Sequence, residues 1–350
     1  MRPIGILYEH PEWFKLLFAE LERRRIPFEP LYVNEHWFDP TVREAPYSLV
    51  VNRVSPSSYL RDHAGSILYA RQVLAYLRDL GTPVVNGYDA FTLETSKALQ
   101  ALLCERLGIR YPRARVINHP SQLAAAADGL EFPVIVKPNV GGSGALMRRF
   151  ETPAALRDAA RSGAVDLGID RTALVQEYLA PEDGAIVRVE ILNGEYLYAI
   201  KIFADPDEGF NLCPADICQT DAASAVAMAN GSNGAVAPTP GEACDYGAAA
   251  VVAPVGPLAA KKALRIEACT PPQHIVEDAI RLVKGGGLDI GGVEYLVAAR
   301  DGQPYFYDVN ALSNFVANAP EVVGFDPFVD LTDFIIERAE ASDGAAVALA

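Results

Sequence analysis

The stretch that most constrains the fold is FPVIVKPNVGGSG at 132–144, where an apolar run ends in a lysine. Val134, Ile135 and Val136 are β-branched and are bounded by prolines, which predicts a short buried strand. That strand would hold the ammonium group of Lys137 at a fixed point.

The turn after this lysine is rich in glycine: it contains Gly141, Gly142, Ser143 and Gly144. Glycine lets the backbone approach an anion closely and turn its N–H groups toward it, and a serine hydroxyl adds a donor. A fixed ammonium beside such a loop is a sensible phosphate clamp, although an ordinary strand followed by a glycine turn fits this stretch equally well. The sequence has no G-x-x-x-x-G-K-[ST] loop and no G-x-G-x-x-G after a strand.

The charge balance argues for small-molecule partners. The 350 residues include 30 basic and 45 acidic side chains, a net charge of −15, and no Lys/Arg block, which argues against nucleic acid and anionic membrane surfaces. The five cysteines form no C-x-x-C pair, which favours reduced thiols in a cytoplasm. No apolar span approaches about twenty residues, so we expect a soluble, cytoplasmic protein.

Strands and helices alternate in the first 90 residues. We predict strands at 3–8, 28–33, 47–54 and 83–85, with helices at 11–25 and 60–80. This order predicts a parallel α/β layer. Right-handed crossovers would bring the strand ends near Glu9 and Arg53 to one rim.

The remaining chain is predicted to contain helices and antiparallel pairs of strands. We predict helices at 92–107 (with Thr92 or Thr95 as N-cap), 120–129, 153–161, 272–284 and 327–339, extended segments at 113–118, 146–150 and 173–179, and two hairpins at 185–203 and 292–310. The first hairpin turns at Asn193-Gly194, a strong hairpin signal. The alanine- and glycine-rich stretch at 220–257 fits a lid or insertion of low order, or a small helical excursion.

Two groups of polar residues stand out on these elements. Lys97 begins a helix, Lys137 ends a strand, and Lys201 lies in the apolar strand YAIKIF, where its charge needs a partner. Asp308 and Asn310 share one face of a strand, and Glu294 lies on its hairpin partner. Two carboxylates and an amide oxygen suit Mg²⁺. The alternative is a pair of acids neutralised by nearby arginines.

Taken in order, several segments resemble the ATP-grasp carboxylate–amine ligases, in particular the glutathione synthetase, ribosomal-protein-S6 modification and D-alanine–D-alanine ligase branch. The segments are TPVVNGYDAF, TSKALQ, FPVIVKPNVGGSG, ALVQEYL, IVRVEIL, YAIKIF and GGVEYLVAARDGQPYFYDVNA. The resemblance implies an α/β fold, α+β in its C-terminal part. It implies an N-terminal α/β domain at 1–91, a small ATP-grasp subdomain at 92–177 and a C-terminal subdomain at 178–350 that carries the metal site.

The resemblance also implies roles for individual residues. Lys97 and Lys137 would hold the α- and β-phosphates of ATP, under a flap at Gly141–Gly144. The linker Gln176, Glu177, Tyr178 and Leu179 would read the adenine edge. Arg188 and Lys201 would face the γ-phosphate and the acyl-phosphate, and Asn211, the third catalytic candidate, would correspond to the asparagine of the family's glycine-rich partner loop. Glu294, Asp308 and Asn310 would bind Mg²⁺, with Mn²⁺ as an alternative metal.

Some positions depart from the family pattern. The middle metal ligand, usually glutamate, is the shorter Asp308, and Ile186 stands where relatives often carry an acid. The ribose contact would then fall to Glu182 or Asp183, a choice left open. Ala-Leu-Ser-Asn follows Asn310 in place of the frequent Ser-Pro-Gly. No histidine falls in a matched motif, so no protein general base is assigned.

The activity implied is joining of a small carboxylic acid to an amine, such as amino acids or peptides, through an acyl-phosphate. The alternatives are a different ATP-grasp outcome, such as a kinase or a thioester-forming ligase, and a nucleotide-binding scaffold without turnover. A homodimer is left open. The acceptor pockets would be lined by Glu9, His10, Arg53, Ser55, Ser57, Ser313 and Asn314, unless these residues are merely solvated. Arg53 would pair with a carboxylate.

Overall fold

The structure is a computed structural model that describes residues 1–10, 12–203, 210, 212, 214 and 264–349, with side chains to residue 344. Asn211, the stretch at 220–257 and three cysteines (Cys213, Cys218 and Cys244) lie outside the described residues. The two described cysteines, Cys104 and Cys269, are free thiols.

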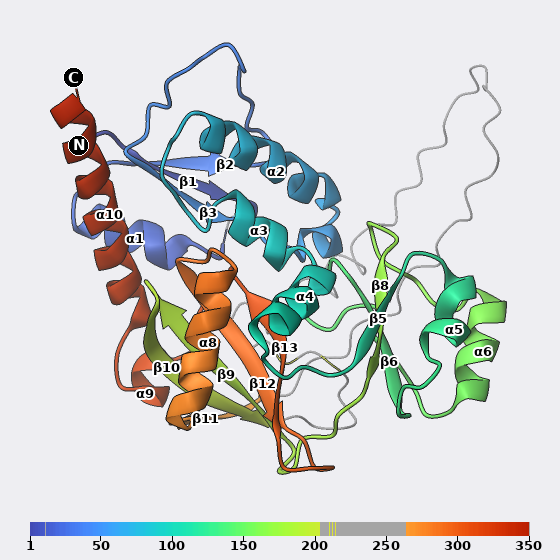
Figure 1. Ribbon diagram of the computed structural model, residues 1–350. Helices are drawn as coiled ribbons and strands as arrows, with labels where there is room; N and C mark the ends of the chain where they lie inside the picture. The colour runs from blue at the N-terminus through green and yellow to red at the C-terminus, as the bar shows by residue number, and fades with distance from the viewer. Residues whose placement is uncertain (11, 204–209, 211, 213, 215–263, 350) are drawn as a thin grey trace, which may run out of the picture.

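The N-terminal part is a parallel α/β layer, as the sequence predicts (Figure 1). Its sheet has the order β2-β1-β3-β4 and consists of β1 (Ile4–Tyr8), β2 (Phe28–Tyr32), β3 (Leu49–Arg53) and β4 (Val84–Val85). The helices of this part are α1 (Lys15–Arg23), the 3₁₀ helix η1 (Ser58–Arg61), α2 (Ala64–Asp79) and α3 (Tyr88–Glu94).

Both faces of this sheet are buried. Leu7 and Val50 pack with Val73 of α2 on one face, while Ile6 packs with Leu17 of α1 on the other. The C-terminal helix α10 (Pro327–Leu349) also covers this second face, so both termini lie at the same end of the molecule (Figure 1). Parallel strands end at the same edge, which brings the carboxyl ends of β1 and β3 to one rim, as expected.

The predicted helix at 92–107 is wrong in one respect, because it is two helices. Helix α3 ends at Glu94 and α4 (Lys97–Leu107) begins after Ser96, whose Oγ accepts a hydrogen bond from Leu99 N. Ser96, rather than Thr92 or Thr95, is therefore the N-cap. The break fixes Lys97 in the first turn of α4.

The small antiparallel sheet has the order β5-β8-β6-β7. It consists of β5 (Ala114–Ile117), β6 (Val134–Pro138), β7 (Arg148–Phe150) and β8 (Ala173–Glu177), with α6 (Pro153–Ser162) on its outer side. The predicted helix at 120–129 is shorter, a 3₁₀ turn η2 (Pro120–Gln122) followed by α5 (Leu123–Ala126). All five residues of β6 are buried, so Lys137 is delivered from a rigid central strand.

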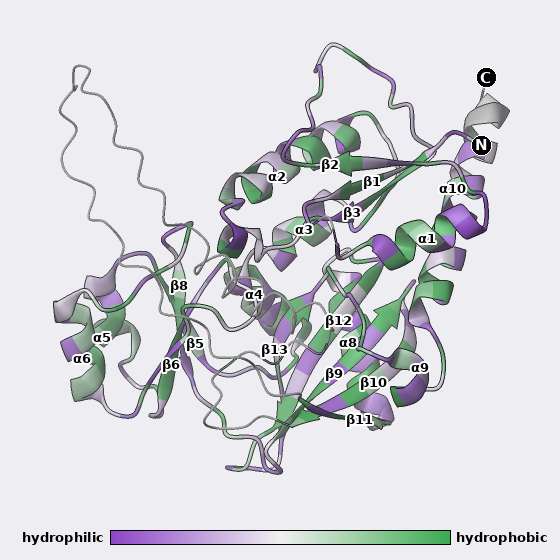
Figure 2. Cartoon of the chain, turned by 180° about the vertical axis from the view of Figure 1, so that it is seen from behind, coloured by the Kyte–Doolittle hydropathy of each residue, from purple (hydrophilic) through white to green (hydrophobic). Residues whose placement is uncertain are grey.

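The larger antiparallel sheet has the order β11-β10-β9-β12-β13. It consists of β9 (Ala185–Leu192), β10 (Glu195–Phe203), β11 (Arg265–Cys269), β12 (Ile290–Val297) and β13 (Pro304–Asn310). Helix α8 (Gln273–Gly285) covers one face, and its apolar stripe packs on the apolar residues of β9 and β12 (Figure 2). Both predicted hairpins are confirmed, whereas β11 and the short α9 (Ala319–Val322) were not predicted. Across the described ranges, no helix is both long and apolar enough to cross a bilayer.

Candidate active site

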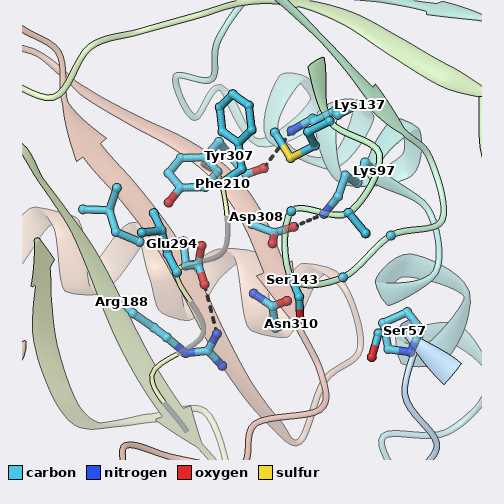
Figure 3. A pocket seen from close by; sticks show the side chains of 18 of the residues that line it. Ser57, Lys97, Lys137, Ser143, Arg188, Phe210, Glu294, Tyr307, Asp308 and Asn310 are labelled. Atoms are coloured by element: carbon cyan, nitrogen blue, oxygen red, sulfur yellow. Dashed lines mark hydrogen bonds and ion pairs between the residues drawn. The ribbon is translucent and has the colours of Figure 1, made fainter. Parts of the chain in front are cut away.

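A cavity of about 440 Å³ lies between the small sheet and the larger sheet, and the rim of the N-terminal layer contributes to its wall. Figure 3 shows charged side chains converging on it from both sheets. Fourteen of the residues that were expected to contact nucleotide, phosphate or metal line it: Lys97, Lys137, Gly141, Gly142, Ser143, Gly144, Gln176, Glu177, Tyr178, Leu179, Arg188, Glu294, Asp308 and Asn310.

Three charged residues form one row across the larger sheet. Arg188 of β9 pairs with Glu294 of β12, which pairs in turn with Asp308 of β13. Directly opposed residues of antiparallel strands project from the same face. The row therefore faces the cavity, and Asn310, two residues after Asp308, faces the same way.

Ion pairs connect this row to its neighbours. The Nη1 atom of Arg188 lies 3.0 Å from Oε1 of Glu294, and its Nε atom lies 2.6 Å from Oε1 of Glu190. Across the cavity, Nζ of Lys97 lies 2.5 Å from Oδ1 of Asp308 (Figure 3). The sequence also allowed the acids to be neutralised by arginine instead of by a metal. This holds in part, since Arg188 is held between Glu190 and Glu294.

The two carboxylates of the row have opposite pKa shifts. Burial raises the pKa of Glu294, and the neighbouring Asp308 carboxylate adds to this. Burial would also raise the pKa of Asp308, but the Lys97 and Lys137 ammonium groups outweigh it and lower that pKa. Two directly opposed carboxylates repel each other, and a cation placed between them would favour the charged form of both.

Lys137 reaches the same region from β6. It is 4% exposed, and its Nζ donates to the carbonyl oxygen of Tyr307 at 3.4 Å. Burial and, next, the positive charge of Lys97 lower the pKa of Lys137 to about 7. An anion bound between the two lysines would relieve this repulsion and favour both charged forms.

These donors fit a magnesium ion. Mg²⁺ prefers oxygen ligands and keeps several waters, and Glu294, Asp308 and Asn310 offer two carboxylates and an amide oxygen on one face. Within the described ranges, no cluster of three or more His, Cys, Asp or Glu side chains has metal-binding spacing, so a site built only from such ligands is absent there.

The glycine loop packs against two other parts of the chain. A Cβ added to Gly142 would lie 2.6 Å from Cβ of Ser57, and one added to Gly144 would lie 2.6 Å from Phe210. Gly144 also has a φ of +67°, which favours glycine. The missing side chain of Gly142 therefore lets the loop lie against Ser57 of the N-terminal layer, and the missing side chain of Gly144 lets it lie against Phe210.

The linker after β8 presents backbone groups to the cavity. The N–H groups of Glu177 and Tyr178 donate to the carbonyls of Arg113 and Pro133 at 3.0 and 2.9 Å. The N–H of Leu179, by contrast, has no acceptor within the part of the chain that the structure describes. That arrangement leaves a donor on the edge where the resemblance places adenine.

Three expected site residues lie away from the cavity. Lys201 pairs with Val187 across the β9–β10 hairpin, so it projects from the face opposite to Arg188, and it forms an ion pair with Asp183. Asp183 and Glu182 are both exposed, and neither lines the cavity. We therefore do not include a phosphate contact of Lys201, or a ribose contact of Glu182 or Asp183, in the proposed function below.

The N-terminal rim is only partly open to the cavity. Ser55, Ser57 and Asn314 line it. Glu9, 1% exposed, is instead held by Arg61 and by His63, whose Nδ1 lies 2.6 Å away. Arg53 is also buried, and its Nη2 donates to the carbonyl oxygen of Ser313 at 2.6 Å and to Oδ1 of Asn314 at 3.2 Å.

Sequence reasoning missed several cavity residues. Trp13, Glu94, Met147, Arg149 and Tyr307 line the cavity as well. Burial raises the pKa of Glu94 to about 7, and one of its oxygens accepts from Leu312 N at 2.7 Å. In the sequence, Leu93-Glu94-Thr95 resembles an ordinary part of a helix, so nothing there marks Glu94 as a site residue. The structure places its carboxyl group at the cavity, where α3 ends shortly before α4 begins.

Comparison with solved structures places this geometry in a known fold. The ATP-grasp ligase PsnB, solved with a minimal precursor, superposes with a TM-score of 0.62 at 18% identity and covers 97% of this chain and 100% of its own. D-alanine–D-alanine ligase from Bacillus anthracis superposes with a TM-score of 0.61 at 15% identity, covering 99% of both chains. The chain has the ATP-grasp fold.

Sequence relatives agree with the ATP-grasp assignment and confirm the resemblance. A D-alanine–D-alanine ligase from Nitrosospira multiformis is 28% identical over 200 residues, which are 53% of this chain and 62% of the relative. A probable α-L-glutamate ligase from Shewanella frigidimarina is 30% identical over 147 residues, 41% of this chain and 48% of the relative. The chain thus spans less than two thirds of the length of these relatives. No protein-family profile matches the sequence.

Proposed function

We propose that this ATP-grasp protein is an ATP- and Mg²⁺-dependent ligase that joins a carboxylic acid to an amine through an acyl-phosphate. The observation that carries the proposal is the row Arg188–Glu294–Asp308, which faces Lys97 and Lys137 across one cavity. Opposed cations and oxygen ligands around a cavity are what phosphoryl transfer requires, because the protein contributes mainly positioning and charge neutralisation.

The nucleotide would bind between the two sheets. Its base would contact the linker at Leu179, and its phosphates would lie between Lys97 and Lys137 under the loop at 141–144. Glu294, Asp308 and Asn310 would hold Mg²⁺, which when bound neutralises phosphate charge and aligns the phosphate oxygens. Two structural neighbours support this assignment, since PsnB was solved with Mg and ADP and the Bacillus anthracis ligase was solved with ATP.

Arg188 would stabilise the transferred phosphoryl group. Its guanidinium is fixed by Glu190 and Glu294. The conformational entropy of the side chain is therefore already lost before the transition state forms, so orienting the group then costs little. The substrate carboxylate attacks the γ-phosphate, ADP leaves, and the amine then displaces phosphate from the acyl carbon. The side chains of Trp13, Ser57 and Asn314 would line the substrate end of the cavity.

Hydroxylamine offers a direct test because it replaces the unknown amine. We expect the purified protein, given ATP, Mg²⁺ and a pool of amino acids and small carboxylic acids, to form a hydroxamate together with ADP. Phosphorylated product without hydroxamate would favour a kinase. Nucleotide binding without any ADP formation across the pools would favour a scaffold.

A further inference from the structure

The linker that would bind the base begins with a buried acid, Glu177, whose carboxylate is held by other residues of the chain. Glu177 is 1% exposed. Its Oε1 accepts from Glu131 N at 3.1 Å and lies 3.4 Å from Nη1 of Arg113. Its Oε2 lies 3.1 Å from Nη1 of Arg300. Both oxygens are therefore engaged by other residues of the chain.

Arg300 comes from the opposite side of the cavity. It lies in the turn between β12 and β13, whereas Glu177, Glu131 and Arg113 belong to the small sheet and its loops. The same guanidinium reaches Oε2 of Glu131 at 3.1 Å, and its Nη2 donates to the Tyr305 hydroxyl at 3.1 Å. It therefore links the two halves of the cavity by side-chain contacts.

The backbone of the same turn also pairs with the linker. Ala299 N donates to the carbonyl of Ala180 at 2.9 Å, and Glu182 N donates to the carbonyl of Val297 at 2.8 Å. The linker segment that would read adenine is thus held at its start by an ion pair and just beyond it by two backbone hydrogen bonds.

We propose that Arg300 is a positioning residue for nucleotide binding: by holding the Glu177 carboxylate from the far sheet, it fixes the linker backbone against the base. This inference rests on the proposed nucleotide site. Glu177 needs compensation because an ionised acid without partners is costly to bury. Arg113 cannot substitute for Arg300, because its contact is longer and it comes from the sheet that already carries Glu177.

The test compares a ligand that has the base with one that lacks it. Binding of ADP and of inorganic pyrophosphate, each with Mg²⁺, is measured calorimetrically for the wild-type protein and for Arg300→Ala, Arg300→Lys and Arg113→Ala. We expect Arg300→Ala to weaken ADP binding about tenfold and pyrophosphate binding less than twofold. Arg300→Lys should fall between, since one ammonium keeps the charge but loses the bridging fork. Arg113→Ala should change ADP binding less than threefold.

Two results would overturn the inference. An Arg300→Ala variant that binds ADP as tightly as wild type shows that the link does not position the linker. Equal weakening of ADP and pyrophosphate shows a general structural defect instead, and Arg300→Lys repeats the comparison if the alanine variant does not fold. Wild-type protein that binds neither ligand would reject the proposed nucleotide site itself.

Discussion

The guanidinium of Arg188 lies directly over the backbone of Gly292. A Cβ added at position 292 would lie 2.2 Å from Nη2 of Arg188 and 2.5 Å from its Cζ. Position 292 is opposite Glu190 on one neighbouring strand and opposite Asn310 on the other. The missing side chain therefore provides the space in which Arg188 crosses the sheet toward Glu294.

We predict that Gly292→Ala displaces Arg188 and lowers kcat/KM about 100-fold, because displacing a catalytic group by about 1 Å can cost that much. The matched control is Gly291→Ala. Its added Cβ would lie 2.8 Å from the Leu288 side chain and 3.4 Å from both the Val283 side chain and the carbonyl oxygen of Asn310, with no Arg188 atom among these contacts. The overlap is with Leu288 in the core, so the main effect should be on stability rather than on turnover. Steady-state kinetics with thermal melting distinguishes these outcomes, and full activity in a folded Gly292→Ala protein would contradict the role of Arg188.

The glycine loop offers a pair of neighbouring substitutions. Gly141→Ala should be tolerated within about twofold, since its Cβ would make only ordinary contacts at 3.7 Å. Gly142→Ala should raise the KM for ATP about tenfold, because its Cβ would clash with Ser57 and push the loop away.

Ser57→Gly removes the atom that this clash requires. The double variant Gly142→Ala/Ser57→Gly should therefore recover most of the ATP affinity lost in Gly142→Ala, as a KM measurement on all four proteins would reveal. Simple additivity of the two substitutions would show that the loop does not rest on Ser57.

Metal dependence tests the role of Glu294. Glu294→Gln removes one of two carboxylates from the row, so the Mg²⁺ concentration for half-maximal rate should rise about tenfold. Glu267→Gln removes an exposed acid of β11 and should leave the Mg²⁺ dependence unchanged. Identical magnesium titrations for the Glu294→Gln and wild-type proteins would exclude Glu294 as a ligand.

Glu9 makes stability depend on pH. Burial opposes its charge, but hydrogen bonds and ion pairs with Arg61 and then His63 outweigh burial, so its pKa is lowered from 4.5. A lowered pKa stabilises the folded state above the unfolded-state value, and this stabilisation is lost as the pH falls through the folded-state pKa.

Glu9→Gln should therefore lower the free energy of unfolding by about 2 kcal/mol at pH 7. The difference from wild type should begin to shrink below pH 4.5, where the carboxyl group of the unfolded state binds a proton, and should vanish below the lower pKa of the folded state. Urea unfolding at pH 7 and pH 4 measures both values. A difference that stays constant between the two would show that ionisation of Glu9 is not responsible.

The face from which Lys201 projects could not be predicted from the sequence, because it depends on the register of the hairpin. At the hairpin turn Leu192 pairs with Glu195, and continuing that register would place Lys201 opposite Ile186, on the same face as Arg188. A bulge between Tyr196 and Tyr198 shifts the register by one residue, so Lys201 pairs with Val187 instead. A one-residue shift reverses the face of every later side chain, and nothing in YLYAIKIF marks the bulge.

Other parts of the site were predictable because local signals determine them. Alternation places Asp308 and Asn310 on one face of β13, and the prolines around VIV bound β6 and fix Lys137 at its end. The break between α3 and α4 was not predictable, because Thr92, Thr95 and Ser96 are all acceptable caps. Tertiary contacts with Asn139, whose carbonyl accepts from Lys97 N at 3.2 Å and whose Oδ1 accepts from Ala98 N at 2.9 Å, accompany the choice.

The most direct test of the ligase proposal is Mg²⁺-dependent release of ADP from ATP, measured against pooled carboxylic acids and pooled amines. Lys137→Ala removes a buried cavity lysine, and Lys15→Ala, at an exposed lysine paired with Glu12, is the matched control. We expect ADP release that requires both pools, persists in Lys15→Ala and disappears in Lys137→Ala. Release that needs neither pool, or that survives unchanged in Lys137→Ala, would contradict it.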